Sequence, residues 1–157
     1  MRKERRAFLG ALAAGTATAL ITGRAGAQEL GSGGALAGAW LAAASRPTGQ
    51  GVVLLTFTSD GTFFRSADTH PLQSVGHGVW NLVSEREIDA MYIALRFDEN
   101  RAHIGTQKTR LRITVGPDGD SFTGLAKVAT VALDGAVTAT SQTQLTGQRI
   151  VAEPFDA

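Results

Sequence analysis

The sequence predicts an all-β protein: an antiparallel up-and-down β-barrel of about eight strands that follows an N-terminal signal-peptide helix. Segments after residue 34 alternate apolar and polar side chains with a period of two. Asp-Gly pairs, which suit tight hairpin turns, separate these segments at Asp60-Gly61, Asp118-Gly119 and Asp134-Gly135. No segment of the domain has the apolar spacing of an amphipathic helix. Because meander connections favour closure, a barrel is favoured over the alternative, a sandwich of two sheets.

Four strands are expected in the first half of the domain. The Ala-rich segment 36–43 is interpreted as the first strand, although residues 34–44 could instead form a turn of helix. The clearest strand is 51–58, which is rich in Val, Leu, Thr and Phe. A type I′ turn at Asp60-Gly61, with positive φ at both central positions, would return the chain into a strand at 62–66. After a longer loop, a short strand at 78–83 contains Trp80.

Four longer strands are expected in the second half, at 88–97, 105–115, 122–133 and 137–151. In 88–97 the larger apolar side chains fall on one face, which we expect in the core: Met91, Ile93, Leu95 and Phe97. The alternative is that the opposite, Ala-rich face points inward, so that Tyr92 and Arg96 orient a ligand. In 105–115 the basic side chains form a solvated face, for which Glu85, Glu87 and Asp89 are the expected acidic partners: Lys108, Arg110 and Arg112.

The N-terminal segment 1–27 is predicted to be a signal peptide. A basic start precedes a weakly apolar stretch of about 16 residues, which is shorter than the roughly 20 residues of a membrane-spanning helix. The pairs Arg5-Arg6 and Phe8-Leu9 resemble the twin-arginine export motif, and cleavage is expected after Ala27, at the small-residue site formed by Ala25 and Ala27. We therefore expect the twin-arginine machinery and signal peptidase as partners, a periplasmic or extracellular location, and no membrane anchor after cleavage. Residues 28–34 would be a flexible leader and 35–157 the barrel domain.

Composition narrows the function classes. The chain has 157 residues, enough for one domain with a self-sufficient core, and no cysteine, which excludes disulfides, thiolate metal sites and a cysteine nucleophile. Of its 15 basic and 14 acidic residues, the predicted signal holds five and one, so the remaining chain has 10 and 13 and a net charge of −3. That balance disfavours nucleic acid and anionic membranes as partners.

A short motif resembles a known group of barrels. Gly38-Ala39-Trp40 is similar to the G-x-W signature that opens the lipocalins and the wider calycin group, and Arg149 stands where their last strand supplies an Arg. The resemblance implies a small barrel that holds an apolar ligand, with Arg149 stacked on Trp40 to close its base. The layout, including a Gly-His-Gly-x-Trp segment, also resembles small exported bacterial proteins of unassigned function.

The connection between the third and fourth strands is longer than a hairpin requires, and long loops on rigid scaffolds often carry function. We expect a ligand site near it at the barrel mouth, with His77 and Trp80, and with Tyr92 and Arg96 if their face points inward. The alternative is that the flanking glycines shape a bulge in which His77 bonds to nearby backbone.

No metal or cofactor is expected. A metal would need His70, His77 and Asp68 to converge, with His103 as a further ligand, and their loop spacing does not enforce this. A haem held by His77 or His103 is likewise not expected. The sequence contains no nucleophile elbow, P-loop or dinucleotide fingerprint, so no catalytic residue is assigned.

The leading hypothesis is a non-enzymatic exported barrel that binds or carries a small, mainly apolar molecule. One alternative is an isomerase or cyclase acting on a small hydrophobic substrate, which requires a titrating group such as His77 inside an enclosed cavity. Another is a structural or interaction protein with a filled barrel and an exposed apolar patch. An interior void below roughly 300 Å³ would exclude both ligand hypotheses.

Overall fold

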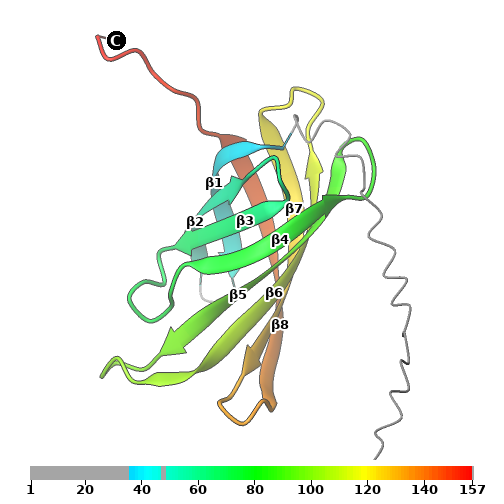
Figure 1. Ribbon diagram of the computed structural model, residues 1–157. Helices are drawn as coiled ribbons and strands as arrows, with labels where there is room; N and C mark the ends of the chain where they lie inside the picture. The colour runs from blue at the N-terminus through cyan, green and yellow to red at the C-terminus, as the bar shows by residue number, and fades with distance from the viewer. Residues whose placement is uncertain (1–35, 47–48, 157) are drawn as a thin grey trace, which may run out of the picture.

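The computed structural model describes residues 36–46 and 49–156, and these form a closed antiparallel barrel (Figure 1). The predicted signal at 1–27 and leader at 28–34 lie outside the described residues. Each strand pairs with its neighbours in chain order, and β1 pairs with β8 to close the barrel. No helix in the described ranges is long and apolar enough to cross a membrane. The strands are β1 (Gly38–Arg46), β2 (Gly49–Phe57), β3 (Thr62–Ala67), β4 (Gly76–Leu82), β5 (Glu87–Phe97), β6 (His103–Val115), β7 (Ser121–Val131) and β8 (Val137–Arg149).

The predicted up-and-down barrel is therefore confirmed, and the sandwich is excluded. Every expected strand is present with slightly shifted ends. The Ala-rich first segment is a strand rather than a turn of helix, because it pairs along its length with β2 on one side and β8 on the other. Its small inward residues, Ala42 and Ala44, leave the interior space to larger side chains from other strands.

The type I′ geometry predicted for the Asp-Gly turns is wrong. Only the glycines have positive φ, at 87° for Gly61, 75° for Gly119 and 87° for Gly135. The N–H of each glycine donates to a carbonyl three residues earlier, at 3.0 to 3.2 Å, which indicates a type I turn followed by a left-handed glycine. The aspartates do not adopt the predicted positive φ. Instead, the side chains of Asp60 and Asp134 accept a hydrogen bond from the backbone N–H two residues on.

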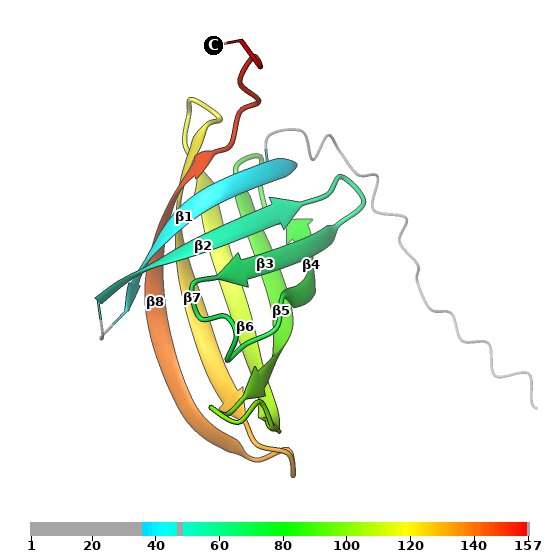
Figure 2. The ribbon, with the colours of Figure 1, turned by 90° about the vertical axis from the view of Figure 1, so that its left-hand side faces the viewer.

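The two halves of the barrel differ in strand length. Strands β2 to β4 have 9, 6 and 7 residues, whereas β5 to β8 have 11 or 13 and extend beyond them at one end (Figures 1 and 2). Where β4 is absent, the β3–β4 loop (68–75) takes its place beside β5: the Ser74 N–H donates to the Leu95 carbonyl at 3.0 Å, and the Phe97 N–H to the Leu72 carbonyl at 2.9 Å. The loop thus continues the barrel wall.

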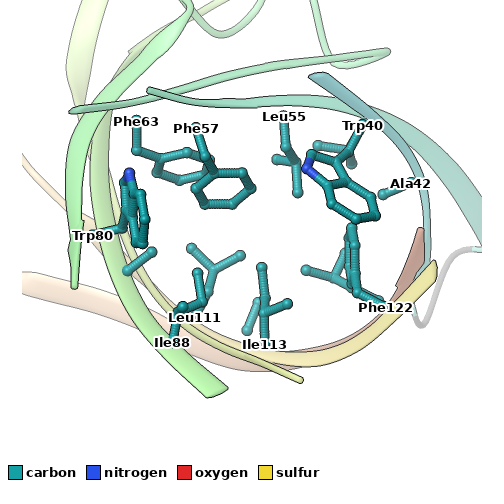
Figure 3. Close-up of a cluster of buried hydrophobic side chains, with 14 of the residues drawn as sticks. Trp40, Ala42, Leu55, Phe57, Phe63, Trp80, Ile88, Leu111, Ile113 and Phe122 are labelled. Carbon is teal, nitrogen blue, oxygen red and sulfur yellow. The ribbon is translucent and has the colours of Figure 1, made fainter. Parts of the chain in front are cut away.

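Aromatic side chains fill one end of the barrel, the aromatic end (Figure 3). The rings of Phe57 and Phe63 stack with centroids 4.5 Å apart, and Trp80 lies edge-on to Phe57 at 6.0 Å. The Trp80 indole N–H donates to the Thr58 carbonyl at 3.0 Å, so its polar atom is satisfied although the ring is buried. Aliphatic side chains complete this solid core from β5 and β6: Ile88, Leu111 and Ile113.

Trp40 and Arg149 meet at the base of the aromatic end. The guanidinium lies 4.3 Å from the centre of the indole ring, as the lipocalin resemblance implies. Arg149 also donates to the Ala37 carbonyl at 2.9 Å and to the Gly119 carbonyl at 2.8 Å, and it lies 3.2 Å from Asp120. The arginine therefore joins the first strand, the last strand and the β6–β7 turn.

The expected orientation of β5 is wrong. Ala90, Tyr92 and Ala94 are at most 5% exposed and face the interior, whereas Ile93 and Leu95 are 45% and 44% exposed. The reason is volume at the aromatic end, which already holds the aromatic rings of β2 to β4, and Tyr92 packs edge-on against Phe63 at 5.8 Å. The inward face of β5 therefore presents Ile88 and Tyr92 with two small alanines, and Ile93 and Leu95 lie outside.

Candidate functional site

The end of the barrel opposite Trp40 and Arg149, the cavity end, is hollow. A cavity of about 340 Å³ lies there between the interior faces of the strands and the β3–β4 loop. Aliphatic side chains line it from β1, β2, β6, β7 and β8, and polar side chains line it from β1, β3, the loop, β5, β6 and β8. The lining residues are Ala44, Arg46, Val53, Leu55, Arg65, Thr69, Gln73, Tyr92, Gln107, Thr109, Leu111, Ala126, Val128, Ser141, Thr143 and Leu145.

Arg65 is the buried charge of this cavity. It follows Phe63 on the inward face of β3, and only 5% of the residue is exposed. Its Nη1 donates to Gln73 Oε1 at 2.9 Å, and its Nη2 lies 3.4 Å from Thr69 Oγ1. Its Nε has no acceptor among the described residues. A guanidinium has five N–H donors, so the protein leaves much of this capacity unused.

A chain of neutral polar groups continues from Arg65 across the cavity. Gln73 Nε2 donates to Gln107 Oε1 at 2.8 Å, and Gln107 Nε2 lies 3.4 Å from the Tyr92 hydroxyl and 3.3 Å from Thr109 Oγ1. The Tyr92 ring is 5.6 Å from the Arg65 guanidinium carbon. These contacts join the polar groups of β3, the loop, β5 and β6, and Arg46, Ser141 and Thr143 add polar lining from β1 and β8. Aliphatic side chains form the rest of the wall.

The charge balance of the cavity is positive. Burial lowers the pKa of Arg65, but an arginine stays protonated in proteins, so the buried side chain is a cation. The other charged lining residue, Arg46, is held 2.8 Å from Asp68 at the loop. That same carboxylate accepts the Val52 N–H, and these hydrogen bonds lower the pKa of Asp68. Among the lining residues there is no Asp or Glu.

The four predicted ligand residues do not come together in the structure. Tyr92 lines the cavity, as the inward alternative for its strand required. Arg96 shares the Tyr92 face of β5 but is not a lining residue. The expected place of His77 and Trp80 at the barrel mouth is wrong, because Trp80 is buried in the aromatic end and His77 is exposed on the outer face of β4.

Packing explains the Gly-His-Gly-x-Trp segment. A Cβ on Gly76 would lie 2.5 Å from Cδ2 of Tyr92, and a Cβ on Gly78 would collide with the Met91 carbonyl oxygen. The glycines thus let β4 approach the ring of Tyr92 and the backbone of β5, rather than shaping a bulge around the histidine. The His77 ring packs edge-on against Phe64 outside the barrel, with centroids 5.3 Å apart.

The histidines do not converge on a metal. His103 packs against Phe97 at 5.9 Å, His70 is exposed in the β3–β4 loop, and His77 lies on the outer face of β4. Across residues 36–46 and 49–156, no group of three or more His, Asp or Glu side chains is arranged to hold a metal ion. His77 is also outside the cavity, so it cannot supply the enclosed titrating group that the enzyme hypothesis required.

The outer face of the barrel has a charged cluster and a small apolar patch. Arg112 forms a two-pronged contact with Asp89, both at 2.8 Å, and lies 3.2 Å from Glu87, which confirms two of the three expected acidic partners. On the opposite side of the barrel, Leu41 of β1 faces Leu54 of β2, and both are about half exposed, at 49% and 47%. This pair is the core of a small apolar patch.

Sequence reasoning missed the residues that matter most in the cavity: Arg65, Gln73 and Gln107. One signal was present, because Arg65 stands two residues after Phe63 and so shares its face of a short strand. A basic side chain on the apolar face of a strand is unusual unless it serves a site. Gln73 and Gln107 had no such signal, since their placement depends on the loop path and on the barrel register.

The sequence of the chain matches no protein-family model, no curated protein and no solved structure. The likeness to lipocalins therefore rests on the closed up-and-down barrel and on the Trp40–Arg149 contact. Any statement about function has to come from the cavity itself.

Proposed function

We propose that this protein is an exported barrel that binds or carries a small, mainly apolar molecule in the cavity end, without catalysis. The observation that supports it is the cavity of about 340 Å³, which exceeds the roughly 300 Å³ at which known ligand pockets begin. Its wall combines aliphatic side chains with polar groups that could orient a ligand.

The size of the cavity limits the ligand. At about 30 Å³ for each water-sized group, a volume of about 340 Å³ holds on the order of ten non-hydrogen atoms. Burial of each methylene contributes about 0.8 kcal/mol, so a chain of about six gives roughly 5 kcal/mol, from which the cost of immobilising the ligand is subtracted. Weak to moderate affinity is therefore expected for a simple alkyl ligand.

Native mass spectrometry of the protein purified from its host tests this proposal. We expect a retained small molecule, and we expect Ala126→Leu, which fills the cavity from β7, to lose it. The matched control is Ala129→Leu on the same strand, which adds the same side chain at an outward-facing position. Circular dichroism checks that both variants fold, and Val128→Phe is a second cavity-filling variant. Equal retention by filled and control variants would contradict the proposal.

Export is tested independently of binding. Replacing Arg5-Arg6 by Lys-Lys preserves the charge of the N-terminus but removes the paired arginines that the twin-arginine route requires. We expect the variant to stay in the cytoplasm at full length, whereas the unmodified chain is exported and shortened. Normal export of the Lys-Lys variant would contradict this part of the proposal.

A further inference from the structure

We propose that the ligand is a small monocarboxylate, whose anionic group binds the Arg65 guanidinium while its hydrocarbon part lies against the aliphatic wall. This inference rests on the proposed function, since it names the chemistry of the ligand that the same cavity would hold.

The first observation is a buried cation without a counterion. Arg65 is 5% exposed. Ion pairs within residues 36–46 and 49–156 involve Arg46, Arg112 and Arg149, but not Arg65. The acidic residue of the neighbouring loop, Asp68, is occupied by Arg46 and by the Val52 N–H. A buried charge is normally paired, so an anion from outside the chain is the missing partner.

The second observation is unused hydrogen-bonding capacity. Arg65 donates to the neutral oxygens of Gln73 and Thr69, the latter contact is long at 3.4 Å, and Nε has no acceptor among the described residues. A carboxylate is the acceptor that matches a guanidinium best, because two oxygens meet two parallel N–H groups. The adjacent hydroxyl and amide groups of Tyr92, Gln73 and Thr69 can donate to the same anion.

The third observation is the mixed lining of the cavity. Besides its polar groups, the wall contains aliphatic side chains that offer no hydrogen bonds: Val53, Leu55, Leu111, Val128 and Leu145. A ligand that satisfies both the guanidinium and these side chains has one anionic end and one hydrocarbon end. A small inorganic anion would leave the aliphatic wall empty, and a neutral hydrocarbon would leave the buried guanidinium unpaired.

Isothermal titration calorimetry with isosteric probes tests the inference on the protein purified from its host and stripped of bound molecules. Octanoate and octanamide have the same number of non-hydrogen atoms and differ in charge. We expect octanoate to bind at least about tenfold more tightly, since hydrogen bonds to a charged group are worth more than neutral ones. 3-Phenylpropanoate serves as a second carboxylate, which distinguishes an aromatic ligand from an alkyl one.

Two variants assign the preference to Arg65. Arg65→Met should abolish the difference between octanoate and octanamide, and Arg65→Lys should retain part of it. The matched control is Arg110→Met on the outer face of β6, which removes one positive charge and should leave the preference unchanged. If Arg65→Met does not fold, comparing the two probes on the unmodified protein and on Arg65→Lys still tests whether Arg65 causes the preference for octanoate.

The outcomes separate the two proposals. Equal binding of octanoate and octanamide would overturn the carboxylate inference and leave small-molecule binding standing. Binding of none of the three probes would overturn both for ligands of this size. A preference for octanoate that persists in Arg65→Met would overturn the assignment to Arg65.

Discussion

The two ends of this barrel are built from the same strands but differ in packing: one is filled with aromatic rings and the other contains a cavity. Strand β2 gives Phe57 to the aromatic end and Val53 to the cavity, and β3 gives Phe63 and Arg65 in the same way. At the aromatic end, rings from five strands pack in one stacked and two edge-on pairs, and the N–H of each indole has a hydrogen-bond acceptor. At the cavity end, small and polar side chains replace the rings. The ring packing is thus concentrated at one end, and the other end keeps the cavity in which we propose that a ligand binds.

The comparison is tested most strongly by truncating one side chain at each end. Phe63→Ala removes a ring that is fully buried and stacked on Phe57, and we expect a loss of about 3–5 kcal/mol in the free energy of unfolding. Val128→Ala in the cavity wall should cost about 1 kcal/mol or less, since that side chain is only partly buried beside an existing void. Guanidinium denaturation measures both. Equal losses of unfolding free energy in the two variants would contradict the claim that the aromatic end contributes more to stability than the cavity end.

Gly76 lies close to the ring of Tyr92, which packs on Phe63 of the aromatic end and also lines the cavity. Gly76→Ala would push a Cβ to 2.5 Å from the Tyr92 ring, and overpacking of this kind costs about 1–3 kcal/mol. The measurement is again denaturation, combined with Tyr92→Leu in a double-mutant cycle. We expect the double variant to be more stable than the sum of the single losses predicts. Additive losses would show that the destabilisation by Gly76→Ala does not come from a clash with the Tyr92 ring.

The hairpin turns differ in the residue that adopts a positive φ. The β5–β6 turn has the same hydrogen bonds as the turns at Asp60-Gly61 and Asp134-Gly135, but Arg101 with φ of 64° stands in the position of the glycine. A residue with a side chain costs about 1–2 kcal/mol in this left-handed conformation. Glycine avoids that cost, but it loses more conformational entropy on folding, so the net gain from the substitution is smaller. Arg101→Gly should therefore stabilise the protein by about 0.5–1 kcal/mol in thermal unfolding. The control Asn100→Gly, at a residue without positive φ, should not stabilise it.

The fold was largely predictable because each strand carried local signals. Period-two patterning, β-branched residues and Asp-Gly pairs mark the strands and hairpins, and a chain of consecutive hairpins closes most simply as a barrel. The orientation of β5 was not predictable in the same way. The larger apolar face is normally buried, but here the rings from β2 to β4 fill the aromatic end, and that packing depends on contacts distant in the sequence.

The candidate site was less predictable than the fold. Tyr92 was identified as one of two alternatives, whereas His77 was chosen for its chemistry and its glycine neighbours, and it lies outside the barrel. Arg65 had a local signal, its shared face with Phe63. Gln73 reaches the cavity because the β3–β4 loop follows β5, and no local pattern encodes that path.

Methyl NMR of the protein titrated separately with 1-octanol and with octanoate tests most directly that one end is hollow and binds while the other is solid. We predict the largest shift changes at methyl groups of the cavity wall, Val53, Val128 and Leu145, and the smallest at Ile88 and Ile113 in the aromatic end. Leu41 and Leu54 report on the outer patch. No change with either ligand, or changes centred on the outer patch or the aromatic end, would contradict the account.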